Sequence, residues 1–136
     1  ILFVGTYILN GRILCCHDFF IGLVGHNVTL PCSYDAQTYG VLCICWGQGN
    51  VPRSKCSSTI LSSQDGAVSF RRSPRYQLQG RMTDGDVSLT ILDAQWDDAG
   101  MYGCRVEYPG WFNDYKVNTQ LIMEEGNPHT NHSGFL

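Results

Sequence analysis

Asp98-Ala99-Gly100-Met101-Tyr102-Gly103-Cys104 is the stretch that decides the fold. It begins with turn-forming residues and continues into a run whose large or apolar side chains recur at every second position, at Tyr102, Cys104, Val106 and Tyr108. Because successive side chains of a β-strand point to opposite faces, this period of two predicts a strand with one buried face.

The same period recurs elsewhere in the chain, and no segment shows a sustained helical period. Val87, Leu89 and Ile91 alternate with Ser88 and Thr90, which predicts a second strand. Turn-forming residues separate the short runs, and they occur at 47–52, Gln64-Asp65-Gly66, Asp84-Gly85-Asp86 and Asp97-Asp98-Ala99-Gly100. Short strands at this spacing predict an all-β sandwich.

Two further features make the sandwich specific. Val28-Thr29-Leu30-Pro31-Cys32 places a cysteine early in the chain, and Trp46 follows it after fourteen residues. Together with Tyr102 and Cys104, this pattern resembles an immunoglobulin variable-type domain. The resemblance implies a disulfide from Cys32 to Cys104 between the two sheets, with Trp46 packed on it and Tyr102 in a tyrosine corner.

The immunoglobulin resemblance also implies a structural ion pair. Arg75, beside Tyr76 at the expected start of a strand, is the candidate partner of Asp98, and Arg81 is a competing candidate.

Length, charge and cysteine content limit the class of protein. A chain of 136 residues, 43% of them hydrophobic, supports one domain with one core. The net charge of −3 gives no general attraction to nucleic acid, and Arg71-Arg72-Ser73-Pro74-Arg75 is interpreted as a solvated turn. Seven cysteines and the sequons that begin at Asn27 and Asn131 indicate a secretory environment, with glycosylation expected at both asparagines.

Composition divides the chain into three parts. Residues 1–18 are expected to be an N-terminal arm or the remnant of a signal peptide, because their apolar run is too short to span a membrane. Residues 19–125 form the predicted immunoglobulin domain, and the polar segment 126–136 is the expected start of a flexible stalk. We therefore expect the extracellular part of a type I membrane protein, with its anchor beyond Leu136.

One turn carries the residues that point to function, Pro109-Gly110-Trp111-Phe112-Asn113-Asp114. Its first two residues are turn formers, so the aromatic side chains of Trp111 and Phe112 should project into solvent or onto a partner. Asn113 and Asp114 offer the oxygen ligands that calcium prefers, and a divalent ion there would bridge the protein to an anionic group. The turn predicts a metal-assisted contact with a membrane.

The outward direction of Cys45 predicts a second disulfide. Because Trp46 faces inward, Cys45 and Cys43 point to the outer side of their strand. Cys56 can bond to Cys45 if the intervening loop folds back over that outer face. Such a bridge would hold the loop near the aromatic turn and contribute about 2 to 3 kcal/mol.

From about Phe19 to Glu125 the chain resembles the T-cell immunoglobulin and mucin-domain family of cell-surface receptors. The resemblance rests on Gly25-His26-Asn27-Val28-Thr29-Leu30-Pro31-Cys32, Cys45-Trp46-Gly47, Tyr76-Gln77-Leu78-Gln79-Gly80, Gly85-Asp86-Val87-Ser88-Leu89-Thr90-Ile91 and the turn at 109–114. It implies a phosphatidylserine receptor that binds Ca²⁺, or another divalent cation, through Asn113 and Asp114. Trp111 and Phe112 would then enter the bilayer, and residues 47–55 would form the opposite wall of the headgroup cleft.

The cysteines depart from the family pattern. Val51 and Gly103 stand where relatives carry a bonded pair, so one expected disulfide is absent and the cleft wall is held less rigidly. Cys15, Cys16 and Cys43 are additional, and their pairing stays open.

Other functions are weighed against lipid binding. No Ser, His and Asp arrangement indicates an enzyme, and the final strand lacks the preceding Phe-Gly-X-Gly signature of an antigen-receptor variable domain. The main alternative is a metal-independent immune receptor or adhesion module that binds protein ligands on other cells, with Trp111 and Phe112 in a protein interface. In that case Asn113 and Asp114 serve as ordinary turn caps. Under the lipid hypothesis, Asp114→Ala is expected to abolish binding and leave the fold intact.

Overall fold

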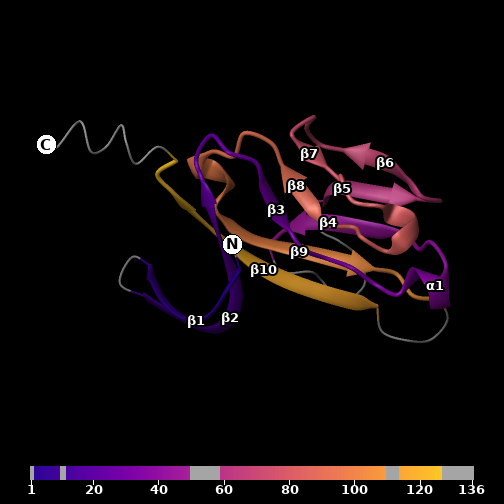
Figure 1. The fold of residues 1–136 in the computed structure, drawn as a ribbon, viewed down its shortest axis with the longest axis horizontal. Coiled ribbons are helices and arrows are strands. Elements are labelled where there is room, and N and C mark those ends of the chain that lie inside the picture. Colours follow the sequence, from indigo (N-terminus) through magenta and orange to yellow (C-terminus); the bar gives the residue numbers. More distant parts are fainter. Residues whose placement is uncertain (1, 10–11, 50–58, 110–113, 127–136) are drawn as a thin grey trace, which may run out of the picture.

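The computed structural model is a two-sheet β-sandwich (Figure 1) that describes residues 2–9, 12–49, 59–109 and 114–126, with side chains from residue 19 onward. Its elements are β1 (Leu2–Leu9), β2 (Arg12–Leu23), β3 (Val28–Leu30), α1 (Ala36–Tyr39), β4 (Ile44–Gln48), β5 (Thr59–Gln64), β6 (Ala67–Arg71), β7 (Tyr76–Gln77), η1 (Met82–Asp84), β8 (Leu89–Ile91), η2 (Trp96–Asp98), β9 (Gly100–Val106) and β10 (Tyr115–Glu124). The all-β variable-type sandwich predicted from the sequence is confirmed.

The larger sheet has the strand order β1-β2-β10-β9-β4-β5-β6. β10 runs antiparallel to β9, with Tyr115 opposite Val106, and parallel to residues 19–23 of β2. The hairpin of β5 and β6 closes through Asp65 and Gly66, whose φ angles of 53° and 80° are both positive. A two-residue type I′ turn requires such angles, so the turn predicted there is confirmed.

The smaller sheet, β3-β8-β7, packs on the inward face of the larger one and closes the core (Figure 1). Cys32, just after β3, and Cys104 in β9 form the predicted disulfide, with Cα atoms 6.5 Å apart. Trp46 is fully buried, and its indole N–H donates to the carbonyl oxygen of Val87 at 2.8 Å. The rest of the core includes Leu30, Ile44, Ile60, Leu61, Leu89, Ile91 and Leu121.

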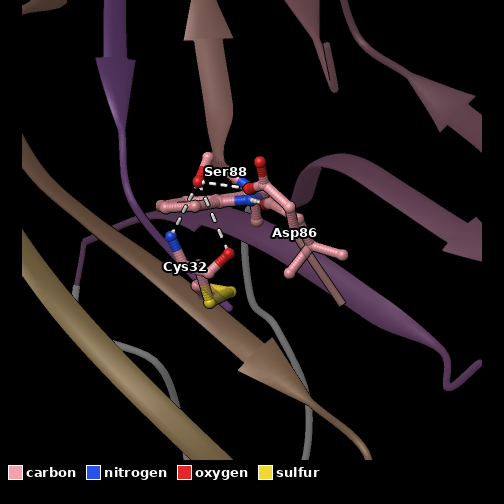
Figure 2. Close-up of a disulfide and its surroundings, with 6 residues drawn as sticks. Cys32, Asp86 and Ser88 are labelled. Carbon is pink, nitrogen blue, oxygen red and sulfur yellow. Dashed lines mark hydrogen bonds between the residues drawn. A yellow bond between two sulfur atoms is a disulfide. The ribbon is translucent and has the colours of Figure 1, made fainter. Parts of the chain in front are cut away.

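Ser88 forms hydrogen bonds to Cys32 and Asp86 beside this disulfide (Figure 2). Its hydroxyl accepts a hydrogen bond from the Cys32 N–H at 3.1 Å and donates one to Asp86 Oδ1 at 2.7 Å. The preceding Gly85 has a φ of +87°, and a Cβ there would lie 1.9 Å from the carbonyl oxygen of Tyr34. The turn therefore requires glycine at this position.

The expected tyrosine corner and structural ion pair are both present. The Tyr102 hydroxyl donates to the carbonyl oxygen of Asp98 at 2.7 Å. The Asp98 carboxylate pairs with Arg75, while the competing candidate Arg81 lies 3.1 Å from the exposed carboxylate of Asp84. The first pair ties β7 to the turn before β9.

Two local features depart from the sequence-based expectations. The short helix α1 is additional, and Asp35 caps it by accepting a hydrogen bond from the Thr38 N–H at 3.1 Å. The basic group at 71–75 is more than a solvated turn. Arg71 Nε donates to the Tyr76 carbonyl at 2.7 Å, and Arg72 donates to a carbonyl of β5, so these side chains connect strands.

The N-terminal arm forms a hairpin in which β1 pairs with β2 from Leu2 opposite Phe20 to Leu9 opposite Arg12. Residues 19–23 of β2 pair with β10. The arm therefore continues into the sandwich through a single strand. The division into residues 1–18, 19–125 and 126–136 stays a prediction.

Candidate metal and lipid site

The predicted site lies at the end of the sandwich where β9 ends at Val106 and β10 begins at Tyr115 (Figure 1). Trp111, Phe112 and Asn113 lie outside the described residues, and their roles stay predictions. Asp114 is the predicted metal ligand that the structure places.

Asp114 holds the two sides of this turn together. Its Oδ1 accepts a hydrogen bond from the Tyr108 N–H at 3.2 Å, and its Oδ2 forms an ion pair with the guanidinium of Arg105. The Asp114 side chain is 13% exposed. Each oxygen of the Asp114 carboxylate therefore already contacts one group of the protein.

Arg105 is the residue that sequence reasoning missed. It follows Cys104, which faces the core, so its side chain lies on the outer face of β9. In register it stands opposite Cys45 of β4 and Lys116 of β10. Although it lies on the outer face, its side chain is only 7% exposed. Alternation along the strand indicates that Arg105 points to the outer face, as it does for Cys45, and this signal could have identified Arg105 from the sequence.

The chemistry of Asp114 suits a calcium ligand. A carboxylate has about four acceptor positions, and the contacts described above use one on each oxygen. Among the described residues, no group of three or more His, Cys, Asp or Glu side chains could hold a metal ion. Calcium takes about six to eight oxygen ligands. A calcium ion at Asp114 would therefore need Asn113, main-chain carbonyls, water or the oxygens of a ligand to complete its shell.

Tyrosines surround the base of the turn. The rings of Tyr39, in α1, and Tyr108 meet edge to face with centroids 4.7 Å apart. Tyr39 is 50% exposed and Tyr115 is 42% exposed. The pKa of Tyr108 is raised, mainly because the side chain is partly buried and to a smaller extent because Tyr39 and Tyr115 lie nearby. The exposed rings of Tyr39 and Tyr115 form an aromatic surface with polar hydroxyl groups beside the predicted site.

The cysteines near the site are described in part. Cys45 is disulfide-bonded, and its predicted partner Cys56 lies outside the described residues, so that pairing stays a prediction. Cys43 has a free thiol, and burial with nearby carboxylates raises its pKa, which lowers the thiolate fraction. The side chains of Cys15 and Cys16 lie outside the described part of the chain.

The remaining predictions fall partly outside the described residues. Asn27 is exposed, and its side-chain oxygen accepts a hydrogen bond from the Asp93 N–H at 3.0 Å; its glycosylation stays a prediction. The second sequon, at Asn131, is not described, and neither are residues 50–55 of the predicted cleft wall. Across the described ranges, every helix is too short or too polar to cross a bilayer.

Known proteins share this sequence pattern. Residues 20–123 match the immunoglobulin V-set domain. The Mus musculus protein "Hepatitis A virus cellular receptor 1 homolog" is 50% identical over 104 residues, which are 76% of this chain and 33% of that protein. "T-cell immunoglobulin and mucin domain-containing protein 4" of Homo sapiens is 42% identical over 108 residues, which are 79% of this chain and 29% of that protein. The chain thus spans about a third of the length of these relatives.

Solved structures agree with the sequence comparison. Tim-1 superposes with a TM-score of 0.78 at 42% identity, covering 84% of this chain and 97% of that chain. "Tim-4 in complex with phosphatidylserine" superposes with a TM-score of 0.75 at 42% identity, covering 79% and 99%. With its V-set fold and these relatives, the chain belongs to the T-cell immunoglobulin and mucin-domain family.

Proposed function

We propose that this domain binds phosphatidylserine in a calcium-dependent manner, as the extracellular part of a type I cell-surface receptor. The observation that carries the proposal is the likeness to the Tim-4 structure with phosphatidylserine, at 42% identity, together with Trp111-Phe112-Asn113-Asp114 in this chain. Recognition or uptake of apoptotic cells, or immune regulation, is the proposed setting.

In this proposal the aromatic side chains of the turn provide affinity for the membrane, and the oxygen-bearing side chains select the headgroup. Burial of a large apolar side chain stabilises by roughly 1.5 to 3 kcal/mol, so Trp111 and Phe112 supply roughly 3 to 6 kcal/mol on entering the bilayer. That affinity does not distinguish one headgroup from another. Asn113 and Asp114 would hold the cation, which when bound supplies direct coordination of phosphate or carboxylate oxygens. Headgroup selection therefore resides in the two oxygen-bearing residues.

Cosedimentation with vesicles tests the metal ligands separately from the fold. Asn113→Ala should lose calcium-dependent binding to phosphatidylserine vesicles. Asn118→Ala, which removes the same side chain at an exposed position of β10, should bind like the unmodified protein. Equal binding by the two variants, or binding that survives a chelator, would count against the proposal.

The aromatic rings are tested in the same way. Trp111→Ala should bind phosphatidylserine vesicles more weakly at every calcium concentration, because the apolar contribution is lost. Trp96→Ala is the matched control, since Trp96 is 53% exposed and lies near Ile122, toward the other end of β10. Equal weakening in both variants would show that insertion of the turn does not drive binding.

A protein ligand on another cell is the second candidate. It is favoured by the exposed rings of Tyr39 and Tyr115 beside the turn, because aromatic residues are enriched in protein interfaces. A protein ligand that binds Asn113→Ala as tightly as the unmodified domain, with chelator present, would support this metal-independent function.

A further inference from the structure

We infer that strand β1 joins two copies of this chain edge to edge into a two-fold symmetric dimer. β1 is the terminal strand of the seven-stranded sheet, and in the described part of the chain it pairs with β2 alone. Figure 1 shows this hairpin extending away from the two packed sheets. The backbone groups on the outer edge of β1 are therefore open to another strand. The inference stands apart from the proposed lipid binding, because it uses no residue of the turn at 109–114.

The arm has little support from the sandwich. The match to the V-set domain begins at residue 20, and β10 pairs with β2 from Phe19 to Leu23. Across the ranges that the structure describes, the earlier residues of β2 pair with β1 only. A two-stranded hairpin is marginally stable in water by itself, and three or more strands are needed for independent stability. A further strand on β1 would therefore supply what the hairpin lacks.

The sequence of β1 favours pairing with an added strand. Leu2–Leu9 reads Leu-Phe-Val-Gly-Thr-Tyr-Ile-Leu, which contains no charged residue and no proline. Natural edge strands usually carry charges, proline or an extra residue that prevents edge-to-edge association. The register of the hairpin does shift between Gly5 and Tyr7, but two residues of β2, Cys15 and Cys16, lie opposite one residue of β1 there. The extra residue is thus in β2, and β1 stays regular.

A second copy of β1 fits this edge better than a bilayer or another strand of the chain. A bilayer cannot satisfy the unpaired backbone groups, because open sheet edges do not occur in the hydrocarbon region. At the other end of the sheet, β6 contains an extra residue, Ser69, opposite the step from Ser62 to Ser63 in β5, which disrupts an added ladder. The terminal strands of the smaller sheet have three and two residues. Among the described edges, β1 alone offers eight regular residues.

Two copies of β1 are self-complementary when they run antiparallel. Each presents the same edge to the other, and eight residues at about 3.4 Å per residue give a paired length of about 27 Å. No like charges meet across the pair, because β1 carries none. The contact uses the β1 edge of both copies, so the assembly closes as a dimer and leaves no β1 edge for a third copy.

Light scattering during size-exclusion chromatography of the complete chain measures the assembly over a range of concentrations. The unmodified protein should have twice the mass of one chain at high concentration, and electrophoresis without reductant should show that no disulfide joins the copies. Val4→Lys should raise the dissociation constant of the dimer by about tenfold or more, because like charges then lie close together at the paired edge. Ser69→Lys places the same charge at an exposed position of β6 and should leave the dimer unchanged.

Hydrogen exchange locates the contact. The backbone amides of residues 2–9 should exchange more slowly in the dimer than in the diluted monomer, and those of β6 should exchange equally in both. A monomeric mass at every concentration overturns the inference and needs no variant to fold. A dimer that Val4→Lys does not weaken, a dimer joined only by disulfides, or masses that grow beyond two chains also overturn it. Calcium-dependent binding to phosphatidylserine vesicles is measured separately, and its presence or absence decides the proposed function alone.

Discussion

Replacing Asp114 with Ala should destabilise the whole domain as well as the proposed metal site. The change removes the carboxylate partner of Arg105, whose side chain is 7% exposed. Loss of one partner from a buried ion pair costs about 3 to 5 kcal/mol. We expect the lower end, about 3 kcal/mol, because Asp114 is 13% exposed and water can reach the vacated position. The sequence-based expectation that this variant leaves the fold intact is therefore revised.

Urea denaturation measures this loss, with the fluorescence of buried Trp46 as one probe of unfolding. The matched control is Asp84→Ala, because its partner Arg81 is 82% exposed and such surface pairs contribute about 0 to 1 kcal/mol. Adding Arg105→Met to Asp114→Ala should restore most of the lost stability, because no buried charge remains. Equal losses for Asp114→Ala and Asp84→Ala would refute the buried pair.

Two further predictions concern the fold. Tyr102→Phe removes the hydrogen bond to the Asp98 carbonyl and should cost about 1 kcal/mol. Burial raises the pKa of Tyr102 to about 12, above about 10 in the unfolded chain. The stabilisation of the folded state by protonated Tyr102 is therefore complete at pH values below the pKa of the unfolded chain. It is lost as the pH rises through the pKa of the folded protein, because the unfolded chain releases the tyrosine proton first. Denaturation at alkaline pH should show this loss in the unmodified protein and not in Tyr102→Phe, and parallel profiles would contradict the assignment. Gly85→Ala should cost more than Gly25→Ala, measured as free energies of unfolding. Both glycines have a φ of +87°, but only at Gly85 would the added Cβ meet the Tyr34 carbonyl, so equal costs would show that this contact relaxes.

The parts of the fold that follow from short-range patterns were predictable. Tyr102 and Cys104 share one face by alternation, and the Asp65-Gly66 dipeptide satisfies the backbone of a tight hairpin turn. Pairing of Arg75 with Asp98 was expected from the immunoglobulin resemblance, but Arg81 was an equal candidate by residue type. The structure separates them because β7 brings Arg75 to the turn before β9.

The site was less predictable because its contacts cross between elements. Alternation gives Arg105 an outward direction, but its pairing with Asp114 depends on the register of β9 and β10 and on the path of the turn. Likewise, Tyr39 reaches Tyr108 only because α1 forms near the end of β9. Four residues are too few to show a helical period. Residue types in the turn could therefore indicate a class of ligand, but they could not indicate that the buried guanidinium of Arg105 pairs with Asp114.

Fluorescence of Trp111 tests the central proposal most directly. In a Trp96→Phe background, Trp111 should report its own surroundings, because Trp46 is fully buried in the core. Calcium and phosphatidylserine vesicles together should shift the emission to shorter wavelength, and a chelator should reverse the shift. Phosphatidylcholine vesicles should leave the emission unchanged. An emission that does not move with calcium and phosphatidylserine, or a shift that persists in chelator, would contradict calcium-dependent insertion of the turn.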